Sequence, residues 1–257
     1  DYAPVDARGF VKVDALASLL RPDTTLVSIM AVNNEIGSIQ PIHDIAALLE
    51  DRPTISFHVD AVQALAKVAT ELYLPERVDF ATFSSHKFHG LRGVGFVYIK
   101  EGKKITPLLT GGGQEKEMRS TTENVAGIAA TAKALRLAIE NQEAFASKTQ
   151  QMKEVIRQEL ANYSDVTVFS GEDHFAPHIL TFGIKGVRGE VVVHAFEEFD
   201  IYISTTSACS SKAGKPAGTL IAMGVDKSMA QTAVRLSLDL ENDMSQVEQF
   251  LTKFKLI

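Results

Sequence analysis

The stretch from residue 78 to residue 90, Val-Asp-Phe-Ala-Thr-Phe-Ser-Ser-His-Lys-Phe-His-Gly, joins an apolar run to a polar cluster. The run Val78 to Phe83 is rich in residues that favour strands, so we predict a β-strand there. The polar cluster that follows offers hydroxyls, imidazoles and the amine of Lys87. Ligands of α/β proteins bind beyond the carboxyl ends of the strands. The stretch therefore indicates an α/β sheet with a candidate site at its edge.

Other apolar, β-rich runs alternate with a helical pattern on both sides of this stretch. The alternation predicts an α/β fold with a mostly parallel sheet, forming a large domain over residues 1–144. Pro41 is suited to the first position of a helix, so we expect a helix to start there. The other predicted elements are strands at 26–32, 55–59 and 94–99 and the helix at 42–50.

A smaller α+β domain is predicted for residues 145–257. A long helix is expected from Asn124, with Ser120 and Glu123 as a capping-box pair at its start. The remaining predicted elements are helices at 148–161, 190–199 and 243–253 and strands at 166–169, 179–184, 201–204 and 234–238.

The composition narrows the class of protein. The 257 residues are 45% hydrophobic with a formal net charge of −6, and no basic cluster is longer than Lys103-Lys104. A nucleic-acid partner is therefore not expected. No apolar run is long enough to span a bilayer and no signal pattern opens the chain, so we expect a cytoplasmic protein. The single cysteine, Cys209, excludes an internal disulfide.

Polar residues also follow the strands predicted at 26–32 and 55–59. They include Asn34 after the first and Asp60 and Gln63 after the second. Lys87 could form a Schiff base if burial and neighbouring cations lowered its pKa. Asp60 could pair with a protonated pyridine nitrogen, as pyridoxal phosphate requires. The alternatives are a solvated surface lysine and a turn or helix-cap aspartate.

Two residues outside this edge could bind anions. Thr122 stands next to the start of the helix from Asn124, where free N–H groups favour a phosphate, although an ordinary first-turn threonine is equally expected. Arg235 alternates with aliphatic residues in the strand at 234–238, and its guanidinium could bind a carboxylate or form a structural salt bridge. The triple glycine at 111–113 is more often a mobile turn than a phosphate cradle.

Cys209 lies in a small, polar segment, residues 207–214, unlike the surroundings of a buried structural thiol. Such a setting favours a reactive cysteine over an inert one. A zinc site built from His58, Asp60, His86 and His89 is an alternative, but the spacing of these ligands matches recognised zinc patterns only loosely. We expect no metal.

Six motifs, in order along the chain, resemble those of the cysteine desulfurases, which belong to the class V aminotransferase family of fold-type I pyridoxal-phosphate enzymes. The resemblance implies a three-layer large domain and a small domain that carries the cysteine. The motifs are Val-Asn-Asn-Glu-Ile-Gly (32–37), His-Val-Asp-Ala-Val-Gln (58–63), Ser-Ser-His-Lys (84–87), Gly-Gly-Gly-Gln-Glu (111–115), Met-Arg-Ser-Thr-Thr (118–122) and Ser-Ala-Cys-Ser-Ser (207–211).

The resemblance also implies roles for individual residues. Thr122 would reach the cofactor phosphate of a neighbouring subunit, which implies a homodimer. Arg235 would bind the substrate carboxylate, and Cys209 would attack the substrate sulfur. Four further roles concern the cofactor: Lys87 is its covalent anchor, Asp60 pairs with its pyridinium nitrogen, Asn34 and Gln63 address its phenolic oxygen side, and Ser84 and His86 hold its phosphate.

The implied reaction removes sulfur from L-cysteine, giving L-alanine and a persulfide on Cys209. The persulfide would pass to an acceptor protein in iron–sulfur cluster assembly or tRNA thiolation. Two alternatives remain: a selenocysteine lyase or another class V enzyme, and a catalytically inactive scaffold that binds such a partner.

Relative to the family, the chain begins inside the large domain. The preceding part ordinarily supplies a Gly-Thr phosphate-binding turn and a histidine that stacks on the cofactor ring. For the 257-residue polypeptide we therefore expect weak or absent cofactor binding and negligible turnover.

Overall fold

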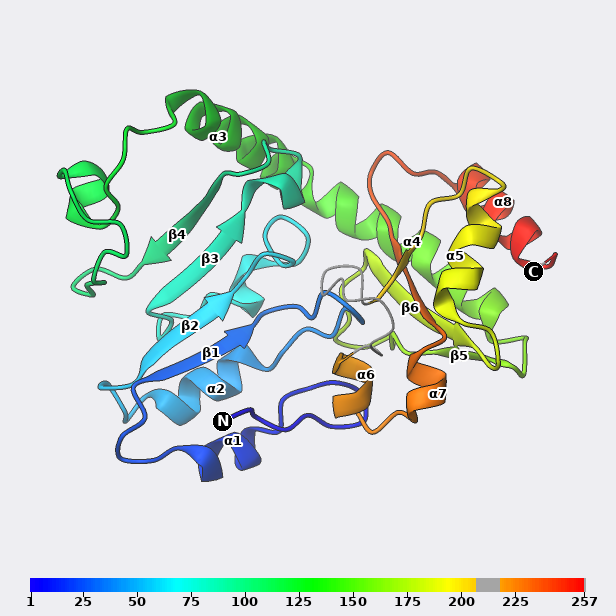
Figure 1. Cartoon of the computed structure of the whole chain (residues 1–257), viewed down its shortest axis with the longest axis horizontal. Coiled ribbons are helices and arrows are strands. Elements are labelled where there is room, and N and C mark those ends of the chain that lie inside the picture. The colour runs from blue at the N-terminus through cyan, green and yellow to red at the C-terminus, as the bar shows by residue number, and fades with distance from the viewer. Residues whose placement is uncertain (207–217, 257) are drawn as a thin grey trace.

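A computed structural model describes residues 1–206 and 218–256. Figure 1 shows two sheets side by side, joined by two long consecutive helices, the first at the top of the view and the second descending from it past the second sheet. The first sheet has the strand order β1-β2-β3-β4, with β1, β2 and β3 parallel and β4 antiparallel at the edge. Its strands are β1 (Leu26–Met30), β2 (Ser56–Asp60), β3 (Phe80–Ser84) and β4 (Gly95–Ile99).

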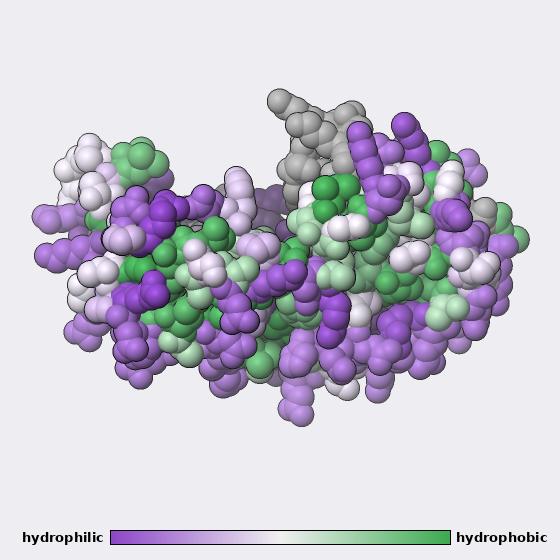
Figure 2. Space-filling view, turned by 90° about the horizontal axis from the view of Figure 1, so that it is seen from below, coloured by the Kyte–Doolittle hydropathy of each residue, from purple (hydrophilic) through white to green (hydrophobic). Residues whose placement is uncertain are grey.

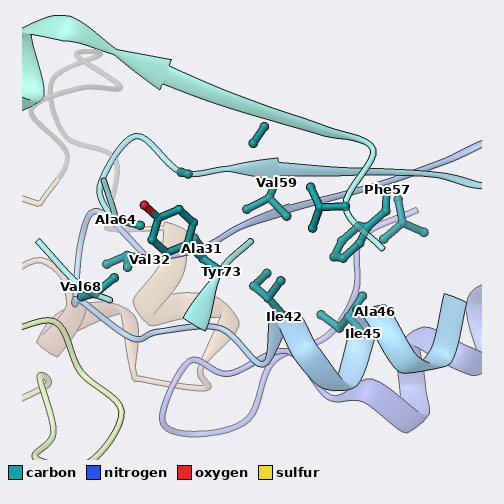
Figure 3. Packing of buried hydrophobic residues seen from close by; sticks show 14 of the residues in the cluster. Ala31, Val32, Ile42, Ile45, Ala46, Phe57, Val59, Ala64, Val68 and Tyr73 are labelled. Atoms are coloured by element: carbon teal, nitrogen blue, oxygen red, sulfur yellow. The ribbon is translucent and has the colours of Figure 1, made fainter. Parts of the chain in front are cut away.

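Helices α1 (Val13–Leu19) and α2 (Ile42–Leu49) pack beneath this sheet in the view of Figure 1. In Figure 3, Ile42, Ile45 and Ala46 of α2 point toward Phe57 and Val59 of β2. All five side chains are buried. Burial of each large aliphatic or aromatic side chain contributes about 1.5–3 kcal/mol, so this apolar layer holds the strand ends in place.

The second sheet is antiparallel and has the order β5-β6-β8-β7. Aromatic rings pack against one another in its core: the rings of Phe196 and Phe250 stack with centroids 4.9 Å apart, and Phe182 packs edge-on against Phe250. Its elements are α4 (Gln142–Leu160), β5 (Val166–Val168), β6 (Ile179–Ile184), α5 (Gly189–Glu197), β7 (Ser204–Thr205), β8 (Ala233–Ser237) and α8 (Met244–Phe254).

The α/β class and the mostly parallel first sheet are confirmed. The strand at 179–184 is confirmed at both ends, whereas the strand expected at 201–204 is reduced to β7. Several short helices were not predicted, because so few residues show little hydrophobic periodicity. They are α1, α6 (Gly218–Ala222), α7 (Lys227–Ala230), η1 (Thr70–Leu72), η2 (Ser85–Phe88) and η3 (Gln114–Glu117).

The predicted capping box at Ser120 and Glu123 is wrong. Helix α3 (Val125–Glu140) is capped by Asn124, whose Oδ1 accepts a hydrogen bond from the Gly127 N–H at 3.0 Å. Ser120 Oγ accepts instead from the Gly112 N–H at 2.7 Å, so it closes the glycine loop. An asparagine adjoining the helix outcompetes a serine several residues away because its oxygen already lies next to the free amides.

The predicted helix at 148–161 begins earlier, at Gln142, directly after α3 ends. The helix at 42–50 starts at Ile42 with Pro41 at the N-cap. Division of the chain into domains 1–144 and 145–257 stays a prediction.

Seen from below in Figure 2, hydrophilic side chains cover much of the surface, with apolar side chains emerging between them in both halves. Within residues 1–206 and 218–256, every helix is too short or too polar to cross a bilayer.

Candidate functional site

A cavity of about 140 Å³ lies where the carboxyl ends of β1, β2 and β3 face the second sheet. The arrows of these strands point toward the second sheet in Figure 1. Four residues singled out in the sequence line this cavity, namely Asn34, Gln63, Lys87 and Arg235. The remaining lining residues are Lys67, His178, Ile179, Ser237, Leu238 and Asp239.

Lys87 is held at the cavity by a tight turn, η2, which follows β3 directly. Ser85 Oγ and Thr131 Oγ1 lie 2.9 Å apart in the interior and tie the turn to α3. The Gly90 N–H donates to the Ser85 carbonyl at 2.9 Å. A Cβ at Gly90 would lie 1.8 Å from Ser85 Oγ, so only glycine fits there without rearrangement. The backbone that carries Lys87 is therefore fixed from both sides.

Arg235 reaches the cavity from β8, as the predicted alternation requires. Val234 and Leu236 are buried in the second core, while Arg235 and Ser237 line the cavity. The guanidinium donates from Nη1 to the Asn34 carbonyl at 2.8 Å and from Nη2 to Ser204 Oγ at 3.2 Å. Part of its role is thus structural, because it joins the loop after β1 to the second sheet.

The loop after β1 is shaped by an asparagine turn. Asn33 Oδ1 accepts from the N–H groups of Glu35 at 2.8 Å and Ile36 at 3.0 Å. Burial raises the pKa of Glu35, against hydrogen bonding from Thr219 and the charge of Arg235, which lower it. Its Oε2 is buried without a hydrogen-bond partner among the described residues.

Asp60 ends β2 with an exposed side chain, and its Oδ1 accepts from the Val62 N–H at 3.0 Å. The turn role considered for it is therefore present, and the carboxylate remains accessible from solvent. His58 contacts Ser28 Oγ at 2.7 Å and Thr82 Oγ1 at 3.1 Å, across three strands. Burial lowers the pKa of His58, partly offset by the charge of Asp60.

Four predicted cofactor residues lie outside the cavity lining: Asp60, described above, and Ser84, His86 and Thr122. Ser84 ends β3, His86 is exposed on η2, and Thr122 is exposed in the segment that precedes α3. Cys209 falls outside the described residues. In the part of the chain that the structure describes, no three His, Cys, Asp or Glu side chains are grouped to hold a metal ion.

Sequence reasoning missed Lys67 and His178. Burial lowers the pKa of Lys67 to about 8, helped by the charges of Lys87 and Arg235 and opposed by Asp239. His178 is 2% exposed, and burial followed by the charges of neighbouring cations holds its pKa well below the ordinary value. The one feature of the sequence that could have suggested a role for Lys67 is its position as a cationic residue four residues after Gln63.

Asp239 also lines the cavity, and it contacts the turn that carries Lys87. Its Oδ2 lies 3.2 Å from Nε2 of His89, the residue that ends η2 in a left-handed conformation with φ of 65°. This contact joins the turn that carries Lys87 to the end of β8.

The aminotransferase class-V family matches residues 1–250. A "NifS/IcsS protein homolog" of Lactobacillus delbrueckii subsp. bulgaricus is 50% identical over 98% of this chain, and "Cysteine desulfurase IscS" of Clostridium botulinum is 37% identical over 97%. A solved "NIFS-like protein" superposes with a TM-score of 0.91 at 38% identity, covering 100% of this chain and 67% of its own. The NifS-like protein from Rickettsia africae gives a TM-score of 0.87 at 28% identity, with coverages of 99% and 68%.

The chain spans 66% and 63% of the lengths of the two sequence relatives. Within this chain, the match to the family runs through both sheets and includes every described residue that lines the cavity. The chain therefore belongs to the aminotransferase class-V family.

Proposed function

We propose that this chain carries the reaction centre of a pyridoxal-phosphate-dependent cysteine desulfurase. The observation that carries the proposal is the convergence of the Lys87 amine and the Arg235 guanidinium on one cavity at the carboxyl ends of parallel strands. The names of the sequence relatives support the same activity.

The residues around the cavity fit the cofactor. Among the described residues, both ring nitrogens of His178, which lines the cavity, have no hydrogen-bond partner. The cavity is also rich in cations, which suits a phosphate ester and a carboxylate. When bound, pyridoxal phosphate supplies an aldehyde for attachment and a ring that withdraws electrons. The proposed holding residues are Lys87 for the aldehyde, Asp60 for the ring nitrogen, Asn34 and Gln63 for the phenolic side, and Ser84, His86 and a neighbouring subunit's Thr122 for the phosphate.

The chain's own residues then divide the remaining work. Arg235 binds the carboxylate of L-cysteine and orients its α-carbon. The free amine of Lys87 removes the proton from that carbon and later helps to return protons to the carbon skeleton. The Cys209 thiolate attacks the substrate sulfur, so an S–S bond forms as the C–S bond breaks. The products are L-alanine and a persulfide on Cys209.

The partners belong to the same proposal. The exposed position of Thr122, away from the cavity, suits a residue that serves the site of a second subunit in a homodimer. An acceptor protein of iron–sulfur cluster assembly or tRNA thiolation would receive the sulfur in the cytoplasm.

A single-turnover experiment tests this function. With cofactor in excess, to offset weak binding, L-cysteine should give the chain one extra sulfur atom on Cys209 and release one equivalent of L-alanine, measured by mass spectrometry. Cys209→Ala should produce no persulfide and Lys87→Ala should produce neither product. A Cys209→Ala chain that still released alanine at the original rate would contradict the desulfurase mechanism and favour a lyase.

A further inference from the structure

The cavity carries an excess of positive charge. Among the residues that the structure describes, three cationic side chains line it, Lys67, Lys87 and Arg235, against a single carboxylate, that of Asp239. The Oδ2 atom of Asp239 already lies 3.2 Å from Nε2 of His89, a residue outside the cavity lining. A partly closed cavity lined by one sign of charge concentrates ions of the opposite sign. The charge balance therefore points to an anionic ligand.

Lys67 contributes to this excess without a structural partner. Its side chain is partly buried, and it makes no hydrogen bond or salt bridge to any residue in 1–206 or 218–256. Lys153 provides the contrast, because its Nζ donates to the Ala176 carbonyl at 2.8 Å. An ammonium carries three donors, so Lys67 is equipped to bind a ligand oxygen.

His178 is the second unsatisfied group in the cavity wall. The residue is 2% exposed, and neither Nδ1 nor Nε2 has a hydrogen-bond partner among the described residues. Its ring packs against Phe145 at a centroid distance of 5.7 Å, which holds it in place. Buried polar side-chain atoms nearly always find a partner, so an unpartnered pair beside a cavity indicates a missing ligand. The neutral imidazole offers one N–H donor.

Arg235 cannot move freely to meet a ligand. Its Nη1 and Nη2 already donate to Asn34 and Ser204, which fixes the plane of the guanidinium. Lys67 and His178 line the same cavity as this fixed guanidinium.

We propose that Lys67 and His178 are specificity-determining residues, which together with Arg235 bind the α-carboxylate of the amino-acid substrate. Lys67 supplies the second positive charge and His178 donates a hydrogen bond to a carboxylate oxygen. Because L-cysteine is the substrate already proposed, this assignment rests on the proposed function and names the residues that recognise its acid group.

Carboxylate binding can be measured without cofactor or cysteine. Sodium acetate is titrated into the chain while the imidazole resonances of His178 are followed by NMR, and methylammonium chloride is the matched cation. Acetate should shift the His178 resonances saturably, and methylammonium should leave them unchanged. Lys67→Gln should weaken acetate binding about tenfold, the loss of one charge-assisted contact. Lys185→Gln, an exposed lysine outside the cavity, is the control and should bind like the original chain.

Two substitutions at His178 separate ligand binding from packing. His178→Leu keeps the bulk but loses the donor, and His178→Asn keeps a donor. In the single-turnover reaction with excess cofactor, His178→Leu should raise about tenfold the L-cysteine concentration that gives half the maximal rate. The maximal rate should change by less than about threefold, and His178→Asn should restore much of the loss. His174→Asn, at an exposed histidine, is the matched control.

Acetate affinity that is the same in Lys67→Gln, His178→Leu and their controls would overturn the assignment. So would a fall in the maximal single-turnover rate, with the half-saturating L-cysteine concentration unchanged, in both cavity variants. A chain that binds acetate through both residues yet makes no persulfide supports the assignment and contradicts the proposed desulfurase activity, so the two failures are distinguishable.

Discussion

Two regions of the molecule each hold a lysine whose pKa is lowered to about 8 by burial, and they differ in what surrounds the ammonium. Lys153, on α4, is 1% exposed; its Nζ donates to the Ala176 carbonyl at 2.8 Å and lies 5.7 Å from the centre of the Phe175 ring. Lys67 lines the cavity beside Lys87. The same lowered pKa therefore belongs to Lys153, a structural lysine with a hydrogen-bond partner, and to Lys67, a lysine that is available to bind a ligand.

The difference lies in the partners. Around Lys153 a carbonyl and an aromatic face take the positive charge, so nothing further is needed. Around Lys67 the neighbours that act most strongly after burial are Lys87, which repels it, and Asp239, which attracts it. A perturbed pKa indicates function only when the geometry leaves the charge available to a ligand.

The largest expected effect comes from disturbing the backbone of the cavity at Gly90. Gly90→Ala places a methyl group 1.8 Å from the present position of Ser85 Oγ, so the turn carrying Lys87 must shift. We expect a loss of about 1–3 kcal/mol in the free energy of unfolding, measured with urea, and weaker acetate binding. Gly218→Ala, where a Cβ meets no atom within 4 Å, is the control and should be neutral. Equal stability of the two variants would show that η2 is not held as described.

The next effect is a dependence of stability on pH that separates the two lysines. Both have a pKa of about 8 in the folded chain against an ordinary lysine pKa of 10.5, so between these values the unfolded chain binds more protons. Stability should therefore rise with pH from about 8 to about 10.5, by at most about 1.4 kcal/mol per pH unit for each lysine. The contribution of Lys67 should be the smaller one because solvent screens it.

Urea unfolding at several pH values, with and without acetate, distinguishes the regions. Lys153→Met should reduce the slope whether or not acetate is present. Acetate should suppress the part of the slope that Lys67→Met removes, because a bound anion raises the pKa of Lys67. If acetate leaves the slope of unfolding free energy against pH unchanged in the original chain, Lys67 does not bind the anion and is a structural lysine like Lys153.

The smallest effect is expected at the bridge between His89 and Asp239. Their side chains are 64% and 37% exposed, so the contact should contribute only about 0–1 kcal/mol to stability. Asp239→Asn also removes the one carboxylate that lines the cavity, so acetate binding should tighten, by about twofold. Weaker acetate binding in this variant would mean that Asp239 orders the cavity rather than opposing the anion.

The sequence predicted much of this architecture because the core elements carry strong periodicity. The strand at 179–184 was located at both ends, and the alternation around Arg235 placed it and Ser237 on the cavity side of β8. The antiparallel direction of β4 could not be predicted, because strand direction depends on pairing and not on the local pattern.

The cavity was predicted only in part. Asn34, Gln63 and Lys87 follow three consecutive strands, so the rule for strand ends brought them together. His178 opens β6 far along the chain and meets Lys67 only through packing of the second sheet against the first. A chemical meaning for either residue depends on that tertiary contact, which no local sequence pattern contains.

The central claim is that Lys87 is the reactive amine of a cofactor-binding cavity. The most direct measurement adds pyridoxal phosphate to the chain, reduces any adduct with borohydride and maps the modified lysines by mass spectrometry. The account predicts modification at Lys87 that is lost in Lys87→Ala, with Lys153 unmodified. Modification spread over exposed lysines, with none favoured at Lys87, would contradict it.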